Sequence, residues 1–267
     1  MLISLLIGAL SAVLTVLPLA WKWQLGVARV TIVVVVLAAL AVAIVAALDA
    51  ALGLNVVVAA LLVWLLALAL ATALLAYRFY RDPERTVPDG DGAILSPADG
   101  EVVYVREARG GVLPVSSKLG RDYPLEELTK TPLAAQDNIV VGIALSFLDV
   151  HVNRAPIGGR AVVKRHFPGR FGSLRRPEMV FENERATLVL ERGDLQIAVV
   201  MIASRLVRRI VTFVQEGEEL TAGQRIGMIR FGSQVDVVLP LRDGLAVLVE
   251  PGDRVVAGET AIASLEV

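Results

Sequence analysis

Cysteine is missing from this 267-residue chain, histidine occurs twice, and aromatic residues make up only 5%. Without cysteine there can be no disulfide, no thiol nucleophile and no thiolate metal ligand. Two histidines, His151 and His166, are too few for a zinc site built from several imidazoles, and no carboxylate cluster suggests another metal. The net charge of −1 lacks the basic excess typical of nucleic-acid-binding domains. We therefore expect neither a metal-dependent nor a nucleic-acid-binding protein.

Charge is almost absent from the first 77 residues, where only Lys22, Arg29 and Asp49 carry it. Hydrophobic residues make up 55% of the chain and raise its mean hydropathy to +0.66. Three apolar runs are each close to the roughly 20 residues that cross a bilayer as a helix. The runs are residues 2–20, 30–48 and 54–75. We predict a membrane anchor over residues 1–77 with two or three transmembrane helices.

The flanking charges predict how this anchor is oriented. Basic residues follow the first and third runs, at Lys22, Arg29 and within residues 78–85, whereas the second loop has none. By the positive-inside tendency, three spans place the N-terminus outside and the second half of the chain in the cytoplasm, at the cell (inner) membrane. A two-span hairpin would instead keep the N-terminus and the second half of the chain on the same side of the membrane. A cleaved signal peptide is disfavoured, because the first run lacks a basic region before it and a cleavage site after it.

The second half is predicted to be a mainly β domain over residues 93–267, after a juxtamembrane linker over residues 78–92 that is rich in proline, glycine and charge. Short β-branched runs bounded by Gly, Pro, Asp or Asn are typical of strands joined by tight turns. Few stretches keep a helical period, and residues 125–130 are the best short candidate for a helix. The predicted strands are residues 100–106, 138–147, 159–166, 186–191, 196–203, 210–214 and 226–229.

Two segments of this half, residues 214–227 and 249–263, share a pattern of two glycine turns between short strands. The pattern resembles the barrel-sandwich hybrid of lipoyl and biotinyl carriers. Neither turn carries the lysine tripeptide that such carriers modify, so a swinging-arm carrier is not expected. We therefore expect a mainly β, barrel-sandwich-hybrid-like domain preceded by an α-helical transmembrane anchor.

Three residue clusters indicate chemistry, and they occur in a fixed order together with two supporting segments. The clusters are Leu95-Ser-Pro-Ala-Asp-Gly-Glu, Phe147-Leu-Asp-Val-His-Val-Asn-Arg-Ala-Pro and Phe231-Gly-Ser-Gln-Val, and the segments are Arg81-Asp-Pro-Glu-Arg-Thr-Val-Pro and Glu182-Asn-Glu-Arg. Over residues 78–239 this set resembles the phosphatidylserine decarboxylase proenzymes of the short bacterial or archaeal form (type A). Archaetidylserine decarboxylase is the close variant of that form.

The resemblance implies a pyruvoyl-dependent lyase of phospholipid biosynthesis that converts phosphatidylserine to phosphatidylethanolamine and CO₂. The proenzyme would cut itself between Gly232 and Ser233, which lie between two β-rich runs. Glycine has no Cβ to hinder attack of Ser233 Oγ on its carbonyl. Cleavage would leave a β chain of residues 1–232 and an α chain of residues 233–267, held together as a heterodimer. The α chain would begin with a pyruvoyl group, which forms a Schiff base with the substrate amine, and neither a metal nor pyridoxal phosphate is expected.

A serine nucleophile needs a base, and His151 is the candidate for this role and for reprotonating the product. Asp99 is the candidate for orienting the imidazole, as the third member of a triad, or for acting itself through water. The chain departs from the long bacterial and mitochondrial forms at Gln234 and at Arg154, which stands where those forms have a second histidine. The identity of the maturation base therefore stays open between His151 and Asp99.

Basic residues interrupted by phenylalanine and leucine over residues 160–176 suggest contact with lipid headgroups rather than a solvated loop. The candidate substrate-binding residues are Arg154, Lys164, Arg165 and His166. Two other functions stay open, a membrane-anchored adaptor of an export system and a non-processing homologue that only binds lipid. An adaptor should carry a long coiled-coil hairpin, which the chain lacks. A higher oligomer of the two-chain heterodimer stays open as well.

Overall fold

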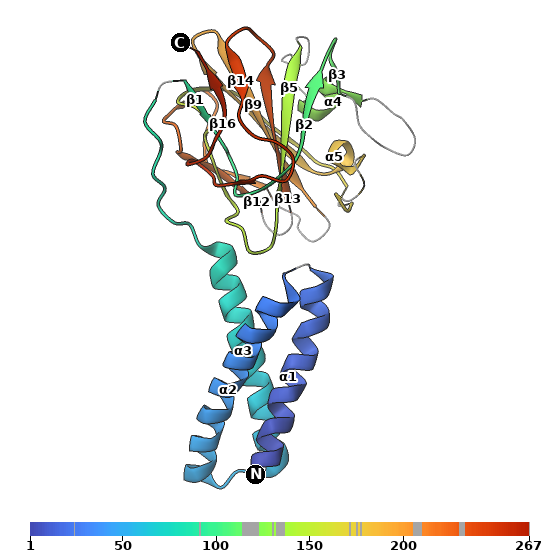
Figure 1. Ribbon diagram of the computed structural model, residues 1–267, viewed down its shortest axis with the longest axis vertical. Coiled ribbons are helices and arrows are strands. Elements are labelled where there is room, and N and C mark those ends of the chain that lie inside the picture. The colour runs from blue at the N-terminus through green and yellow to red at the C-terminus, as the bar shows by residue number, and fades with distance from the viewer. Residues whose placement is uncertain are drawn as a thin grey trace. The chain divides into compact units, whose positions relative to one another are not determined.

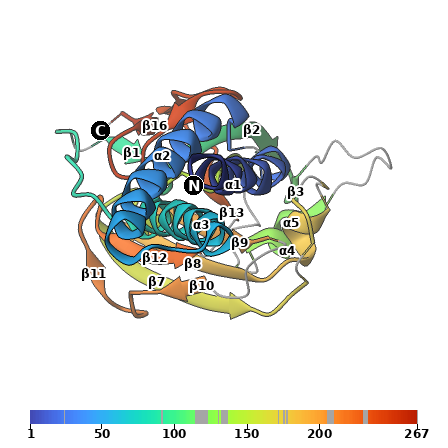
Figure 2. The same cartoon turned by 90° about the horizontal axis from the view of Figure 1, so that it is seen from below.

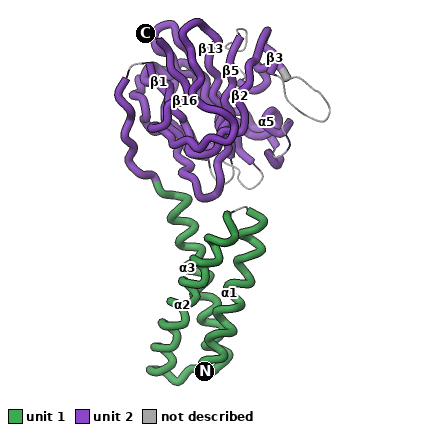
Figure 3. Tube along the Cα trace, in the orientation of Figure 1, with its two compact units in different colours: residues 1–81 green, residues 82–267 purple. Residues whose placement is uncertain are grey.

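The computed structural model has two compact units, residues 1–81 and 82–267 (Figures 1 and 3). Unit 1 is helical and unit 2 is mainly β, which confirms the predicted fold class. Residues 82–92 of the predicted linker group with unit 2. The structure describes the whole chain except residues 24, 91, 114–122, 130, 132–136, 171, 175, 177, 205–209, 230–232 and 267.

Unit 1 consists of three helices, α1 (Leu2–Lys22), α2 (Val27–Leu52) and α3 (Val56–Tyr80). All three are long and apolar enough to cross a membrane, and they correspond to the three apolar runs. Local signals explain the turn between α2 and α3. Gly53 ends α2 with a φ of 62°, and the Asn55 side chain caps α3 by accepting a hydrogen bond from the Val57 N–H.

Figure 2 shows the three helices of unit 1 roughly end-on. Small residues let these helices pack closely. Gly8 of α1 lies so close to the Ala60 carbonyl of α3 that a Cβ would collide with it. Trp64 Nε1 donates to Thr15 Oγ1 over 3.2 Å, which also joins α1 and α3. Close approach of small residues and hydrogen bonds across helices are the interactions that hold helices together in lipid. Most of the large apolar side chains point outward, as an anchor in a bilayer requires.

Unit 2 is organised by one curled antiparallel sheet of eight strands, in the order β11-β7-β8-β9-β13-β5-β2-β15. Each of the predicted strands is present in the unit with small shifts at its ends. The sequence indicated only a β-rich run after Ser233, yet this run is the strand β13 near the centre of the sheet. The strands are β2 (Gly100–Ala108), β5 (Asn138–Leu145), β7 (Gly159–Phe167), β8 (Arg185–Arg192), β9 (Leu195–Ala203), β11 (Glu219–Leu220), β13 (Ser233–Pro240) and β15 (Arg254–Val255).

Two three-stranded sheets and a few short elements complete the unit. The first small sheet has the order β1-β16-β14 and the second β10-β12-β6. The helix predicted near residue 125 is confirmed as α4. The elements are β1 (Ala93–Leu95), β3 (Val112–Leu113), β4 (Tyr123–Pro124), α4 (Leu125–Thr129), β6 (Val152–Arg154), α5 (Met179–Glu182), β10 (Ile210–Thr212), β12 (Arg225–Ile229), β14 (Leu245–Val247) and β16 (Ala261–Leu265).

The two double-glycine segments of the sequence have matching places in this fold. Each supplies a two-residue strand to one edge of the large sheet, β11 or β15, and the middle strand of a small sheet, β12 or β16. The second glycine of each has a similar positive φ, 76° at Gly223 and 74° at Gly258. The Gly223 N–H donates to Ala155 O, and the Gly258 N–H donates to Ser96 O. The repeat therefore holds the loops that follow β6 and β1 in equivalent ways.

These two loops also bind each other. The Leu95 N–H donates to Pro156 O, and the Arg154 N–H donates to Pro97 O, both over 2.9 Å. The loop after β1 contains Asp99, and β6 directly follows His151. The repeat thus brings together two of the three clusters that the sequence singled out.

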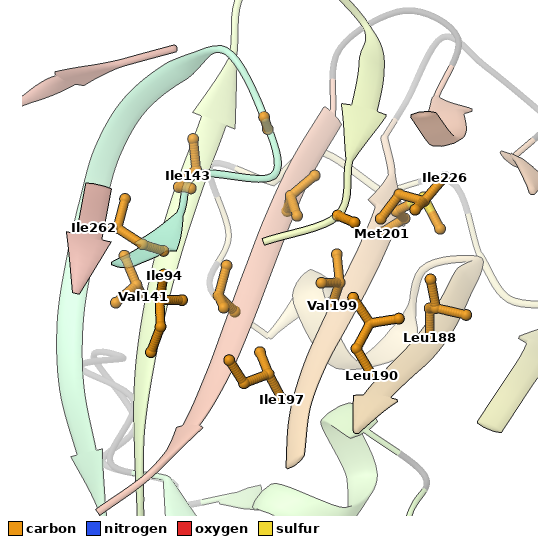
Figure 4. Close-up of a cluster of buried hydrophobic side chains, with 14 of the residues drawn as sticks. Ile94, Val141, Ile143, Leu188, Leu190, Ile197, Val199, Met201, Ile226 and Ile262 are labelled. Atoms are coloured by element: carbon orange, nitrogen blue, oxygen red, sulfur yellow. The ribbon is translucent and has the colours of Figure 1, made fainter. Parts of the chain in front are cut away.

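The large sheet separates two hydrophobic cores, because alternate residues of a strand point to opposite faces. Val235, Val237 and Leu239 of β13 face the larger core, which lies between the large sheet and the two small sheets (Figure 4). Val238 faces the smaller core, where residues of β3, α4 and α5 cover the other side. β13 is therefore buried on both faces, and each of its residues is buried.

Gln234 and Asp236 place polar groups on the smaller-core face of β13. Tyr104 Oη donates to Asp236 Oδ2 over 2.6 Å, and Gln234 Nε2 donates to Asp236 Oδ1 and Tyr104 Oη over 2.7 and 3.0 Å. Tyr104 lies opposite Gly142 on β5, and Gly142 lies opposite Asp236, so the three residues form one row across the sheet. The Tyr104 ring crosses β5 over Gly142 to reach the carboxylate, and only a glycine leaves room for it.

Burial dominates the electrostatics of this row. It raises the pKa of Asp236 to about 6, although the hydrogen bonds from Tyr104 and Gln234 oppose the shift. Burial, followed by the nearby Asp236 carboxylate, raises the pKa of Tyr104 well above its usual range. Near neutral pH, the network therefore contains a buried carboxylate that loses its proton at a cost to stability.

Substitution of Gly142 tests the packing of this row. A Cβ on Gly142 would lie 2.5 Å from the Tyr104 ring, so Gly142→Ala should force the ring away from Asp236 and lower the unfolding free energy by about 2 kcal/mol. Chemical denaturation of the full-length protein in detergent measures the loss. Gly158→Ala is the matched control, because its new Cβ would meet only ordinary contacts. Equal stability of the two variants would contradict the packing described here.

A second substitution tests the buried carboxylate. Because the folded-state pKa of Asp236 lies above its unfolded value, its contribution to stability is full below about pH 4 and is lost as pH rises through 6, a change of about 3 kcal/mol. Asp236→Asn should remove this part of the pH dependence in denaturation curves between pH 4 and 8. The exposed Asp243→Asn control should leave the pH dependence unchanged. An unaltered curve for Asp236→Asn would show that the carboxylate does not titrate in this range.

Candidate active site

Ser233 is the first residue of β13, with Leu145 of β5 on one side and Ala203 of β9 on the other. The residue is 4% exposed, and its Oγ has no hydrogen-bond partner among the residues that the structure describes. A buried hydroxyl without a partner costs about 1–3 kcal/mol, so this serine is a candidate for a reactive group. Gly232, on the other side of the predicted scissile bond, lies outside the described residues.

His151 is fully buried and directly precedes β6. Its Nδ1 lies 2.9 Å from the Asp149 carbonyl oxygen. Since a carbonyl only accepts hydrogen bonds, this contact favours the tautomer that carries the proton on Nδ1 and the basic lone pair on Nε2. The loop is held in place by the Asp149 carboxylate, which accepts from the Ser146 N–H over 2.7 Å and pairs with Arg254.

The backbone brings His151 next to the segment that leads to Ser233. The Ile229 N–H donates to His151 O over 3.2 Å, and Ile229 is the last residue of β12. Only residues 230–232 separate Ile229 from Ser233. The cluster around His151 thus lies close to the segment that leads into the Ser233 cluster. The His151 cluster is in the middle of the chain, whereas the Ser233 cluster is near its end.

Asp99 lies in the turn between β1 and β2 and is 9% exposed. Arg85 Nη2 donates to both carboxylate oxygens, over 3.0 and 2.8 Å, and the Ala257 N–H donates to Oδ1 over 2.8 Å. In the same turn, Pro97 O accepts from Asn153 Nδ2 over 3.3 Å and from the backbone of Arg154. The turn that carries Asp99 therefore packs against β6, the strand that follows His151.

Arg85 is a residue of this site that the candidate list from the sequence lacks. The sequence singled it out only as one of the basic residues after the third apolar run and as part of the segment Arg81-Asp-Pro-Glu-Arg-Thr-Val-Pro, and neither indicates a role in the site. Its partner lies 14 positions away along the chain, in a different turn. No periodicity or spacing rule connects two such residues, so the ion pair required the folded structure.

Arg154 makes internal contacts. The residue is 4% exposed, with Nη1 donating to Gly223 O over 3.0 Å and Nη2 donating to Asp82 Oδ1 and Pro83 O over 3.0 and 2.9 Å. These bonds connect the glycine turn after β11 to the segment that follows α3. They give Arg154, predicted to bind substrate, a structural role in the present arrangement.

The other three basic candidates lie along β7 and are partly exposed. Lys164 Nζ donates to Gln215 Oε1 over 3.1 Å, and Arg165 Nη1 donates to Glu216 Oε2 over 2.9 Å. His166 Nε2 lies 3.2 Å from Glu184 Oε1. Two strands, β8 and β9, separate β7 from β13, which is about 14 Å at the usual strand spacing. The sheet therefore does not bring these residues beside Ser233.

The surroundings of Ser233 fit a pyruvoyl group at this position. Its strand neighbours Leu145 and Ala203 are apolar, and its hydroxyl has no bond to described residues that conversion to a small ketone would break. The buried imidazole of His151 belongs to the adjoining loop. Among the described residues there is no group of three or more His, Asp or Glu side chains placed to hold a metal ion.

The chain is similar to known proteins over most of its length. Residues 72–263 match the model of the family described as Phosphatidylserine decarboxylase. A phosphatidylserine decarboxylase proenzyme from Geotalea uraniireducens is 39% identical over 216 residues, which are 80% of this chain and 91% of that protein. A protein of the same name from Nocardia farcinica is 41% identical over 203 residues, 76% of this chain and 78% of its own.

A third relative, from Methanothermobacter thermautotrophicus, carries the name archaetidylserine decarboxylase proenzyme and is 39% identical over 186 residues, 70% of this chain and 78% of its own. The three clusters around Asp99, His151 and Ser233 all lie within the matched residues. The family match covers well over half of the chain, and the fold brings its clusters together. The chain therefore belongs to the phosphatidylserine decarboxylase family of enzymes.

Proposed function

We propose that this chain is a membrane-anchored proenzyme that cuts itself between Gly232 and Ser233 and then decarboxylates phosphatidylserine to phosphatidylethanolamine and CO₂. One observation carries the proposal: the Ser233 hydroxyl is buried without a partner among described residues, and Ser233 follows by four positions Ile229, whose N–H donates to the His151 carbonyl. Membership of the family supports the reaction, and the relatives are named as proenzymes of phosphatidylserine or archaetidylserine decarboxylases.

Self-cleavage requires only groups of this chain and water. Ser233 Oγ attacks the Gly232 carbonyl carbon and gives its proton to a base, while the peptide C–N bond breaks and its nitrogen takes a proton. An ester now joins the two residues. Loss of the α-proton of residue 233 expels the Gly232 carboxylate and leaves a dehydroalanine. Tautomerisation and addition of water then release ammonia and leave the pyruvoyl group, so no oxidant or reductant is needed.

His151 is the base that we propose for the first step. The contact between Nδ1 and Asp149 O orients the ring and leaves Nε2 able to accept the serine proton. In turnover the same imidazole would hold a proton and deliver it to the substrate carbon that loses CO₂. The pyruvoyl group supplies, when present, an electron-withdrawing ketone that takes up the electron pair released with CO₂. The turn that carries Asp99, whose carboxylate Arg85 holds, would form the side of the site opposite His151.

After cleavage the chains should remain associated as a heterodimer. Residues 233–267 would form the α chain, and this chain supplies β13, which pairs with β5 along Ser233–Pro240 and with β9 along Ser233–Val238. It also supplies β15 and β16, which pair with β2 and β1. Its removal would expose both hydrophobic cores, so separation without denaturant would contradict the proposal.

The anchor would place the site at the inner membrane. The three apolar helices fit membrane anchoring, and the basic residues after the first and third runs favour a catalytic domain on the cytoplasmic side. Lys164 and Arg165 are at least partly exposed and lie two strands away from β13, so we assign them to contact with the membrane surface rather than with the reacting centre. At a membrane surface, each basic side chain contributes about 1 kcal/mol to the binding of anionic lipid.

The decisive experiment is intact mass spectrometry of the full-length protein purified from membranes, beside Ser233→Ala. The wild-type protein should give two fragments divided after Gly232, with the C-terminal one lighter than its serine form by the mass of one ammonia and blocked to Edman sequencing. Ser233→Ala should stay uncut. If the folded wild-type protein also stays uncut, the proenzyme proposal is wrong and a lipid-binding role becomes the better explanation.

His151 can be tested against the second histidine of the chain. His151→Gln should slow self-cleavage and decarboxylation each by at least about 100-fold, the usual contribution of a positioned acid or base. Precursor bands on gels measure the first rate, and release of labelled CO₂ from phosphatidylserine vesicles the second. His166→Gln, which alters an exposed residue of β7, should keep both rates within about twofold. Normal cleavage with lost turnover in His151→Gln would assign maturation to another base.

Parallel assays with ether-linked archaetidylserine distinguish the two lipid substrates.

A further inference from the structure

The segment that follows α3, residues 82–87, has no regular secondary structure, yet side-chain bonds fix it to the rest of unit 2. We call it the juxtamembrane segment. Its first residue, Asp82, binds both Arg154 and Arg225, and its Glu84 binds Arg225 over 2.8 Å. Further along, the Thr86 N–H donates to Glu259 Oε1 over 3.2 Å. The segment therefore has several attachments to unit 2 that do not involve Arg85.

Arg85 is the residue of this segment that reaches the candidate site. Its Nη2 bonds to both oxygens of Asp99, and the two side chains are 11% and 12% exposed. The second carboxylate near Arg85, Glu259, is 3.9 Å from Nη1 and 38% exposed. Charge-assisted hydrogen bonds are short and directional, and they are stronger where water is excluded. The bond to Asp99 is thus the principal interaction of the Arg85 side chain.

Among the described residues, the hydrogen bonds to the Asp99 carboxylate come from both product chains of the proposed cleavage. Arg85 belongs to the β chain, and the Ala257 N–H, which donates to Oδ1, belongs to the α chain. A carboxylate held from two directions has little freedom to rotate. Because the backbone amide cannot be removed by an ordinary substitution, Arg85 is the group through which the orientation of Asp99 can be tested.

We propose that Arg85 is a positioning residue that orients the Asp99 carboxylate for self-cleavage between Gly232 and Ser233. This inference rests on the proposed function and extends it to a residue outside the three sequence clusters. Arg85 acts through Asp99 and need not touch the scissile bond. Asp82, Glu84 and Thr86 hold the juxtamembrane segment in place, so loss of Arg85 should affect the site more than the fold.

The size of the effect follows from how strictly such reactions depend on geometry. A small misplacement of a supporting group costs about 100-fold in rate, so Arg85→Ala should slow self-cleavage by about that factor. Arg85→Lys should recover part of the rate, because lysine keeps the charge but cannot donate through a planar fork. Guanidinium ion added at millimolar concentration should restore part of the cleavage of Arg85→Ala, whereas sodium at equal ionic strength should not.

The test uses cell-free synthesis of the full chain into liposomes, with conversion of precursor to two chains followed on gels. Arg225→Ala is the matched control, because it breaks two exposed bonds of the same segment without touching Asp99, and it should cleave within about twofold of the wild-type rate. Ser233→Ala marks the uncut band. Thermal unfolding of Arg85→Ala and Arg225→Ala, both in the Ser233→Ala background, measures their folding cost separately from cleavage.

The outcomes separate this inference from the proposed function. If the wild-type chain is not cut, the proposed function itself fails. If the wild-type chain is cut and Arg85→Ala is cut equally fast, only the inference fails. If Arg225→Ala is slowed as much as Arg85→Ala, or guanidinium restores nothing, Arg85 serves only to attach the segment, and the positioning role is wrong. Slow cleavage confined to Arg85→Ala, with rescue by guanidinium and by lysine, supports it.

Discussion

The pairing of β13 between β5 and β9 is the constraint on which the rest of unit 2 depends. This strand comes late in the chain, yet it occupies the interior of the large sheet and closes both hydrophobic cores. A strand in that position needs partners on two sides and apolar contacts on two faces, which leaves it almost no freedom of register. The hydroxyl of Ser233, its first residue, is therefore held at a defined place relative to the loops that carry His151 and Asp99.

The polar row of Tyr104, Gly142 and Asp236 makes this register more specific. A shift of β13 by one residue relative to β5 would turn Asp236 toward the larger core and place a valine beneath the Tyr104 hydroxyl. Burial of the carboxylate weakens the fold near neutral pH, and the hydrogen bonds from Tyr104 and Gln234 offset part of that loss. Such a network contributes more to uniqueness than to stability. The hydrogen bonds of Gln234 to Tyr104 and Asp236 give a structural reason for glutamine at this position, where the chain departs from the long forms of the family.

Much of this organisation follows from local pattern. The apolar runs, the β-branched runs and the two double-glycine segments predicted the helices, most strands and the repeated turns, because each depends on neighbours in the chain. The same reasoning could not place β13 correctly, since Gln234 and Asp236 interrupt its apolar run and their partner Tyr104 lies on another strand. It gave Arg85 no role in the site, and it could not show that the donors of Arg154, a candidate for substrate binding, bond inside the unit.

The sequence by itself determined the class of the protein: a charge-poor helical anchor, a β domain, and clusters containing Asp99, His151 and Ser233 that are typical of one enzyme family. These properties reside in composition, period and short motifs, which need no knowledge of distant contacts. Only the tertiary structure decided which side chains meet. Ser233 comes beside the His151 loop, and Asp99 is held by Arg85, because antiparallel pairing and the glycine repeat bring distant segments together.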